Sequence, residues 1–294
     1  MGPIVIVEKV SIRFGGLLAL NEVSFQMEER HIQAIIGPNG AGKTTLFNCL
    51  TGFYKPTEGS IVLRRDGKSY HLTQSPMGSF WGNPAGWMGG FLRNLFTSNP
   101  IHRTALLGVS RTYQNIRLFA QMTGIENLLV AQHNSVNHKL LSGIFQTPGF
   151  LRSEKKALEK AWYWLEFMGL EDTANIEAGN LPYGLQRRLE LARAMATSPR
   201  LICLDEPAAG LNRQEIEDLN RVIVNLRNEH KISVLLIEHH MGVVMNISDR
   251  VVVLDHGEVI SEGTPAEVQK DPRVIKAYLG EEEEDAPPQS RREA

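Results

Sequence analysis

A short segment between an expected strand and an expected helix constrains this chain most. Residues 37 to 45 read Gly-Pro-Asn-Gly-Ala-Gly-Lys-Thr-Thr, which fits the phosphate-binding pattern G-x-x-x-x-G-K-[ST]. The apolar run Ile32 to Ile36 precedes this segment, and residues 44 to 50 can continue as a helix that ends at Thr51-Gly52. The alternative is a chance match, but the strand and the helix around the segment favour a nucleotide-binding loop.

The residue types of this loop suit a polyphosphate. Glycines allow successive backbone N-H groups to turn toward one anion, and the helix start adds partial positive charge. Lys43 places a point charge on the outer phosphates, and the hydroxyl of Thr44 can ligate Mg²⁺. The expected nucleotide contacts come from Gly37, Pro38, Asn39, Gly40, Ala41, Gly42, Lys43, Thr44 and Thr45.

The second half of the chain supplies groups that complete a hydrolase. The apolar strand expected at residues 201 to 204 ends in Asp205, which can hold Mg²⁺, and Glu206, which can polarise the attacking water. A further apolar strand precedes His239, an imidazole that can contact the γ-phosphate or orient the nucleophile. Gln114 is a weaker candidate for reaching the water or the metal. Glu206, His239 and Gln114 are therefore the predicted catalytic residues.

Charge, cysteine content and apolar segments argue against several classes of protein. The net charge of the 294 residues is -2, so no basic field indicates nucleic acid as a partner. Cys49 and Cys203 each lie in an apolar element, which favours reduced core thiols over a disulfide. No apolar segment approaches the roughly 20 residues that span a bilayer. A cytoplasmic protein is expected, and any membrane role would depend on partner subunits.

The pattern of apolar residues predicts an α/β fold with a mainly parallel core sheet. Residues 201 to 204, 234 to 237 and 251 to 254 are unbroken apolar runs, typical of buried parallel strands. Residues 23 to 27 alternate apolar and polar, which indicates an antiparallel strand in a smaller sheet. Helical periodicity between residues 114 and 200 predicts two packing stripes, Leu158, Ala161, Trp162, Leu165 and Met168 on one helix, and Leu185, Leu189, Ala192 and Met195 on another.

Two segments do not fit this outline. Residues 73 to 98 are rich in Gly, Phe, Trp, Met and Pro and lack periodicity. They either cover a sheet edge of this chain or form an apolar patch that contacts a membrane subunit or the bilayer. The acidic run that begins at Glu281 and the polar residues after it predict a disordered tail over residues 281 to 294.

Taken together and in this order along the chain, the motifs resemble those of the ATP-binding subunits of ABC transporters. Residues 37 to 45 are similar to the Walker A motif of that family, and residues 203 to 206 to the end of Walker B. Gln114 looks like the Q-loop glutamine, and His239 like the switch histidine. Phe14 is similar to the aromatic residue that stacks on adenine; its alternative is an ordinary strand aromatic. Residues 181 to 190 align with the family signature, usually Leu-Ser-Gly-Gly-Gln.

The signature departs from the usual pattern. Pro182 replaces the serine, Tyr183 replaces a glycine and Leu185 replaces the glutamine, while Gly184 stays in register. The resemblance implies that Tyr183 and Gly184 meet the nucleotide held by an opposing subunit. Asn212 stands where the family's D-loop usually has Asp. Either this signature site is weakened, or one branch of the family uses a competent variant.

Other segments narrow the branch. Residues 13 to 20, 47 to 56 and 126 to 133, with the ending Ala-Tyr-Leu-Gly at 277 to 280, resemble the LivG type of subunit from high-affinity branched-chain amino acid uptake systems. His240 departs from the Asp that commonly follows the switch histidine.

The resemblance implies a P-loop NTPase of the ABC nucleotide-binding type, with an antiparallel β subdomain and an inserted helical subdomain. Residues 4 to 280 would form the nucleotide-binding domain, with the helical subdomain at about 115 to 196 and the extra loop at about 73 to 98. ATP and Mg²⁺ are the implied cofactors, with Thr44, Gln114 and Asp205 at the metal.

The implied function is ATP hydrolysis that drives uptake of branched-chain amino acids at the cytoplasmic face of the cell membrane. The implied partners are two membrane permease subunits, a second ATP-binding subunit that is a different chain, and indirectly an extracytoplasmic solute-binding protein. Uptake of another small solute such as urea, and a nucleotide-dependent regulator without turnover, remain alternatives. A GTPase lacks support because no Asn-Lys-x-Asp element is present.

Overall fold

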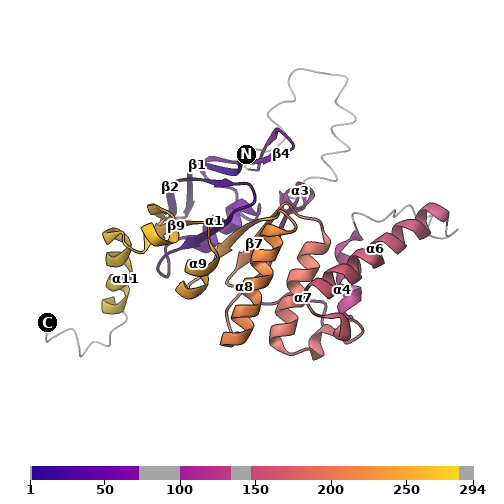
Figure 1. Cartoon of the computed structure of the whole chain (residues 1–294). Helices are drawn as coiled ribbons and strands as arrows, with labels where there is room; N and C mark the ends of the chain where they lie inside the picture. The colour runs from indigo at the N-terminus through magenta and orange to yellow at the C-terminus, as the bar shows by residue number, and fades with distance from the viewer. Residues whose placement is uncertain (1, 73–99, 134–146, 285–294) are drawn as a thin grey trace, which may run out of the picture.

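The computed structural model describes residues 2 to 72, 100 to 133 and 147 to 284. Its centre is a six-stranded sheet with the order β10-β9-β3-β8-β7-β6 (Figure 1). The strands of this sheet are β3 (Ile32–Ile36), β6 (Val109–Arg111), β7 (Leu201–Asp205), β8 (Ser233–Ile237), β9 (Arg250–Asp255) and β10 (Glu258–Gly263).

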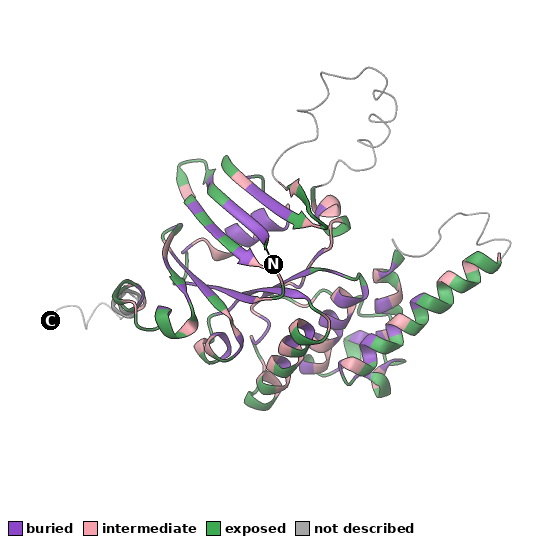
Figure 2. Ribbon diagram, turned by 45° about the horizontal axis from the view of Figure 1, so that its top comes forward, coloured by how far each residue is buried: buried purple, intermediate pink, exposed green. Residues whose placement is uncertain are grey.

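The core strands are parallel and buried, as their unbroken apolar runs predict. β3 pairs in parallel with both β8 and β9, and β7 pairs in parallel with β8 and β6. Every residue of β3, β7 and β8 is buried, and Figure 2 shows them purple along their length. Only β10, at one edge, is antiparallel to its neighbour β9. The prediction of a mainly parallel core is therefore confirmed.

A second, antiparallel sheet lies beside the core sheet, with the order β2-β1-β4-β5. Along residues 23 to 27 the apolar positions are buried and the polar positions are exposed, because alternate side chains of a strand point to opposite faces. The predicted half-buried antiparallel strand is confirmed. The strands are β1 (Pro3–Phe14), β2 (Leu17–Glu28), β4 (Glu58–Arg65) and β5 (Lys68–His71).

Some helices pack on the core sheet, and others form a group at one side of it. The three helices α4, α6 and α7 pack against one another and form the part drawn at the right of Figure 1. The α-helices are α1 (Lys43–Leu50), α3 (Pro100–Leu106), α4 (Gly124–Ala131), α6 (Pro148–Phe167), α7 (Tyr183–Ala196), α8 (Arg213–Asn228), α9 (Met241–Ile247), α10 (Pro265–Val268) and α11 (Pro272–Glu284). Two 3-10 turns, Glu171–Thr173 and Ala178–Asn180, connect α6 to α7.

The buried face of α6 differs from the predicted stripe. Trp162 is 40% exposed and Leu158 is 42% exposed, whereas Trp164 is only 6% exposed. Ala161 and Leu165 are buried as predicted. The prediction that Trp162 belongs to the buried face was therefore wrong, and Trp164 is buried in its place. A 3.6-residue period is compatible with either tryptophan on the buried face, and only the packing of the neighbouring helices decides between them.

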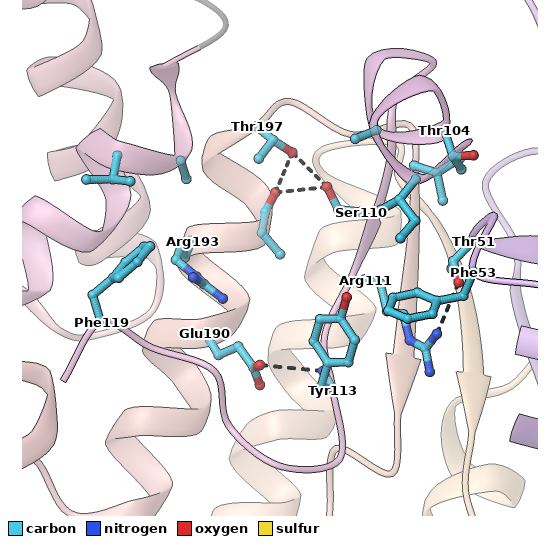
Figure 3. Close-up of a pocket in the computed structure, with 16 residues that line it drawn as sticks. Thr51, Phe53, Thr104, Ser110, Arg111, Tyr113, Phe119, Glu190, Arg193 and Thr197 are labelled. Carbon is cyan, nitrogen blue, oxygen red and sulfur yellow. Dashed lines mark hydrogen bonds between the residues drawn. The ribbon is translucent and has the colours of Figure 1, made fainter. Parts of the chain in front are cut away.

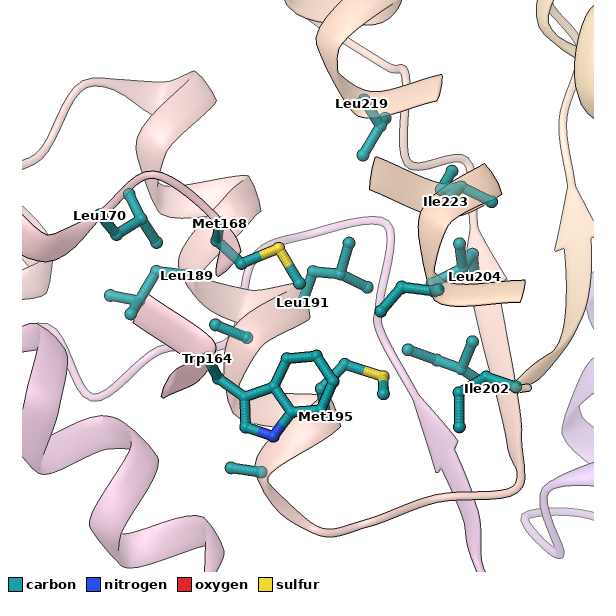
Figure 4. Close-up of a cluster of buried hydrophobic side chains, with 14 of the residues drawn as sticks. Trp164, Met168, Leu170, Leu189, Leu191, Met195, Ile202, Leu204, Leu219 and Ile223 are labelled. Carbon is teal, nitrogen blue, oxygen red and sulfur yellow. The ribbon is translucent and has the colours of Figure 1, made fainter. Parts of the chain in front are cut away.

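The apolar core joins these helices to the sheet. Figure 4 shows Trp164 and Met168 at the end of α6 against Leu189 and Met195 of α7. Further buried side chains come from β7 and α8: Ile202, Leu204, Leu219 and Ile223. The second predicted stripe is buried here, with Leu185 partly buried against the same cluster. One continuous core therefore fixes α7 relative to the carboxyl end of β7.

Several other expectations concern the ends and the inserted segment. Residues 73 to 98 lie outside the described residues. Helix α11 continues to Glu284, so residues 281 to 284 belong to this helix and not to the predicted tail, and the rest of that tail is not described. Cys49 and Cys203 are free and buried, and burial raises the pKa of each thiol to about 12. Within the described ranges, no helix is long and apolar enough to cross a membrane.

Candidate functional site

The glycine loop connects β3 to α1. Its backbone accepts only glycine at two positions. A Cβ on Gly37 (φ 150°) would lie 2.0 Å from the carbonyl oxygen of Leu254, and one on Gly42 (φ 97°) would lie 2.7 Å from the oxygen of Ala19. Lys43 Nζ donates to the carbonyls of Gly37, at 2.7 Å, and Pro38, at 2.8 Å. The ammonium group therefore lies over the loop that the sequence assigns to phosphates.

The first turn of α1 suits an anion. Gly42 is the N-cap and makes no side-chain capping bond, and no acidic residue lies in the first turn. The N-H groups at a helix start carry partial positive charge, which attracts phosphate oxygens. Thr44 and Thr45 follow Lys43 in this turn.

Asp205 ends β7 at the same edge of the sheet. Asp205 pairs with Ile237 of β8, and Ile237 pairs with Ile35 of β3, so the three residues are level across the sheet. Two strand spacings of about 4.8 Å place the backbone of Asp205 about 10 Å from that of Ile35, two residues before the loop. The fold therefore brings residues 37 to 45 and Asp205 to one edge, as the predicted site requires.

A buried arginine links Asp205 to α1. Arg111 donates from Nη2 to Asp205 Oδ2 at 2.8 Å, and both side chains are less than a tenth exposed. From Nη1 the same guanidinium donates to Asn48 Oδ1 at 2.6 Å and to Thr51 Oγ1 at 3.0 Å. Arg111 was not among the site residues predicted from the sequence. The signal that the sequence offered was a cation three residues before Gln114.

The three predicted catalytic side chains meet at Glu206. Gln114 donates from Nε2 to Glu206 Oε2 at 2.8 Å. His239 Nδ1 lies 3.8 Å from the same oxygen and its side chain is 64% exposed. Glu206 itself has a φ of 48°, a conformation that costs free energy for a residue with a Cβ. Its N-H donates to the carbonyl of Ile237 at 2.9 Å, which holds the carboxylate beyond the end of the strand.

The residue after Ile237 also ties this region together. Glu238 is 1% exposed and accepts from the N-H of Ala208 at 2.8 Å and of His240 at 3.3 Å. Burial raises the pKa of this carboxyl. Glu238 thus joins the loop after Glu206 to the turn that carries His239.

The signature residues Tyr183 and Gly184 contact the loop after Glu206 and the start of α8. Tyr183 and Gly184 begin α7, and the Tyr183 hydroxyl donates to the carbonyl of Ala209 at 3.2 Å. A Cβ on Gly184 would lie 2.3 Å from Glu215 Oε1, so glycine permits the close approach of α7 to the first turn of α8. Within this chain, Tyr183 therefore contacts the loop after Glu206, and Gly184 contacts the first turn of α8.

Phe14 is at the end of β1, 42% exposed. Its ring meets that of Tyr54 edge to face, with the centroids 5.2 Å apart. Tyr54 follows α1, and its N-H donates to the carbonyl of Asn48. Tyr54 was not among the predicted site residues. It contacts the candidate base-stacking residue because the chain folds back after α1.

A cavity of about 270 Å³ lies beside residues 113 to 117, the segment called the Q-loop below, between the core sheet and the helices α4 and α7 (Figure 3). Arg111 and Tyr113 line it on one side, and Phe119, Glu190 and Arg193 line the other. The guanidinium of Arg193 lies 5.9 Å from the centroid of the Phe119 ring, and burial lowers the pKa of Arg193. The cavity therefore adjoins the candidate site, because Arg111 in its lining donates to Asp205 and Tyr113 in its lining directly precedes Gln114.

The donor set is compatible with Mg²⁺. Among the described residues there is no group of three or more His, Cys, Asp and Glu side chains that could hold a metal. Thr44 and Asp205 offer hard oxygen atoms at one edge of the sheet, and Mg²⁺ is usually bound by one or two such ligands together with substrate phosphates and water. A cradle of amides and an ammonium group, with carboxylates opposite, defines a P-loop nucleoside triphosphatase.

Comparison with known proteins specifies the family. The ABC transporter family matches residues 20 to 209, more than half of the 294 residues. A second family, branched-chain amino acid ATP-binding cassette transporter, matches residues 258 to 284. The chain therefore belongs to the ABC transporter family and is an ATP-binding subunit of the ABC ATPase type. The predicted family and fold class are confirmed.

Individual relatives are similar over nearly the whole chain. The high-affinity branched-chain amino acid transport ATP-binding protein BraF of Pseudomonas aeruginosa is 50% identical, covering 95% of this chain and 98% of that protein. The corresponding protein LivG of Escherichia coli K12 is 48% identical over the same shares. A crystal structure of the ADP conformation of an ATP-binding cassette matches with a TM-score of 0.74 at 30% identity, covering 95% of this chain and all of that one.

Proposed function

We propose that this chain hydrolyses ATP to drive an importer of branched-chain amino acids. The observation that carries the proposal is the approach of Gln114 and His239 to Glu206, at the sheet edge that carries the glycine loop. The names of the relatives and the match over residues 258 to 284 support this class of solute.

The roles of the site residues form part of this proposal. Residues 37 to 45 bind the phosphates, Phe14 stacks on adenine, and Thr44, Gln114 and Asp205 are the side chains available to Mg²⁺. The metal, when bound, would neutralise charge on the phosphate oxygens. Glu206 accepts a proton from the attacking water, and the hydrogen bond from Gln114 holds its carboxylate in place. His239 orients the terminal phosphate, and catalysis consists mainly of positioning and charge stabilisation.

We also infer the partners and the location. A second ATP-binding subunit, a different chain, would present its glycine loop to Tyr183 and Gly184 of this chain. Two permease subunits would dock at the cavity beside Phe119, which is 47% exposed, and would hold the chain at the cytoplasmic face of the membrane. An extracytoplasmic protein would deliver the solute to those permease subunits. Residues 4 to 280 would act as the nucleotide-binding domain, with residues 115 to 196 as its helical subdomain.

The departures at Pro182 in the signature and at Asn212 in the D-loop do not by themselves favour a regulator without turnover. Asn212 is the N-cap of α8, where its side chain accepts from the N-H of Glu215 in a complete capping box. Asn and Asp are equally good N-caps, so this change leaves the local structure intact. Pro182 is the N-cap of α7, and its carbonyl accepts from the N-H groups of Leu185 and Gln186.

The test uses the complex assembled with co-purified subunits in lipid vesicles. Phosphate release and uptake of labelled leucine are measured for the wild type, for Glu206→Gln and for Glu159→Gln, an exposed carboxylate on α6 that serves as the control. We expect both activities to fall at least about a hundredfold in Glu206→Gln and to be unchanged in Glu159→Gln. Uptake of urea in place of leucine would refute the solute, and turnover independent of Glu206 would refute the catalytic assignment.

A further inference from the structure

One hydrogen-bonded network connects helix α7 to two loops near Glu206. Arg187, on α7, is 2% exposed and donates from Nη1 to the carbonyl of Tyr113 at 2.7 Å, and from Nη2 to the carbonyl of Gln114 at 2.8 Å. Nη2 also donates to the hydroxyl of Tyr183 at 3.2 Å, and that hydroxyl donates onward to the carbonyl of Ala209. The Q-loop, the signature helix and the loop after Glu206 are thus joined through one guanidinium and one phenol.

A buried carboxylate completes the network. Glu190 is 1% exposed, receives a 3.0 Å bond from Arg187 Nη1, and accepts from the N-H groups of Tyr113 at 3.5 Å and Arg117 at 3.3 Å. Arg187 therefore binds Q-loop carbonyls while its ion-pair partner binds Q-loop amides. The planar fork of arginine can donate to all of these acceptors at once, which the ammonium group of a lysine cannot do.

The ring of Tyr183 is fitted to the same loop. A Cβ on Gly210 would lie 3.2 Å from Tyr183 Cε1, so this glycine leaves room for the ring. The phenol is used as an acceptor from Arg187 and as a donor to Ala209, although the ring remains 44% exposed. The residue that replaces a glycine in the usual signature thus makes two hydrogen bonds within its own chain.

We propose that Tyr183 and Arg187 are positioning residues that fix the Q-loop and the loop at 208 to 211 relative to each other, so that Gln114 stays hydrogen bonded to Glu206. This inference rests on the proposed ATPase function. It extends that function because the start of α7 would face a partner subunit. Hydrogen bonds connect this start of α7, through Arg187 and Gln114, to the general base Glu206 of the same chain.

The first test does not depend on activity. Amide hydrogen exchange is measured on the full chain without nucleotide, for the wild type, Tyr183→Phe, Arg187→Lys and the control Tyr163→Phe. Tyr163 is on α6, and its hydroxyl lies 3.2 Å from Nε2 of His230. We expect exchange to accelerate at least about threefold at residues 113 to 117 and 208 to 211 in the first two variants. Unchanged exchange in both segments would overturn the proposal.

The second test separates positioning from nucleotide contact. Steady-state hydrolysis in the assembled complex should show kcat reduced at least about threefold in Tyr183→Phe, with KM for ATP unchanged, and no further reduction when Tyr183→Phe is added to Gln114→Ala. A raised KM with unchanged kcat would indicate that the phenol contacts a nucleotide, and would overturn the proposal. If the wild type lacks turnover, the proposed function fails, whereas the exchange measurement still decides the positioning.

Discussion

The ion pair between Arg111 and Asp205 allows a stability prediction that can be worked from the structure. Replacing Arg111 with Met removes the cation from a carboxylate whose side chain is 8% exposed. Breaking a buried pair by removing one partner costs about 3 to 5 kcal/mol, because the remaining charge is left without compensation. Asn48 and Thr51 also lose their donor, so we expect a loss toward the upper end of this range.

The assay is urea unfolding of the chain without nucleotide or metal. With a slope of ~3 kcal/mol per M, the midpoint of Arg111→Met should fall by about 1 to 2 M. Adding Asp205→Asn should recover at least about 2 kcal/mol, because the amide carries no charge that needs compensation. This recovery separates the electrostatic cause from a general loss of packing.

The matched control is Arg213→Met. Arg213 pairs with Glu217 at the surface, where its side chain is 95% exposed, and such a pair contributes at most about 1 kcal/mol. The prediction is wrong if the free energy of unfolding of Arg111→Met lies within about 1 kcal/mol of the wild-type value. It is also wrong if adding Asp205→Asn lowers the stability of Arg111→Met further.

Three further outcomes follow from the structure. Gly37→Ala should abolish ATP binding in a fluorescence titration and lower stability by more than about 2 kcal/mol, because its Cβ would overlap the carbonyl of Leu254. Trp164→Ala should cost about 3 to 5 kcal/mol and Trp162→Ala less than about half of that, since only the first ring is buried; equal losses would contradict the reported face of α6. Burial lowers the pKa of His230 below its ordinary value of 6.5, so the unfolded chain binds the proton more readily and stability should decline as the pH falls through 6.5; His230→Gln should flatten that decline in thermal unfolding at stepped pH.

Much of the candidate site could be predicted because its motifs are local. The phosphate loop needs a strand, glycines and a helix start within about 15 residues, and each of these leaves a pattern in the sequence. The acid at Asp205 was predictable for the same reason, since an apolar run ending in carboxylates marks the end of a buried strand. Gln114 and His239 were candidates for contacting the water, the metal or the γ-phosphate, and the resemblance added their family roles. Their approach to Glu206 itself was not predicted.

The remaining contacts could not be predicted because they join residues far apart in the chain. Arg111 and Asp205 are separated by 94 positions, and Arg187 lies 74 positions from the carbonyl it binds at Tyr113. No periodicity or motif spacing encodes a pairing of this kind. The choice between Trp162 and Trp164 failed for a related reason, since helical geometry allows both faces until neighbouring helices select one.

The sequence by itself determined the chemistry at each end of the site: a loop that binds phosphates and a strand that ends in acids. It also determined which strands are buried, since the free energy of removing apolar side chains from water depends on composition along each segment. Only the tertiary structure decided which groups compensate the buried charges, because the cost of an unpaired charge is settled by the nearest partner in space and not along the chain. Arg111 at Asp205, and Arg187 with Glu190 behind the Q-loop, are the result.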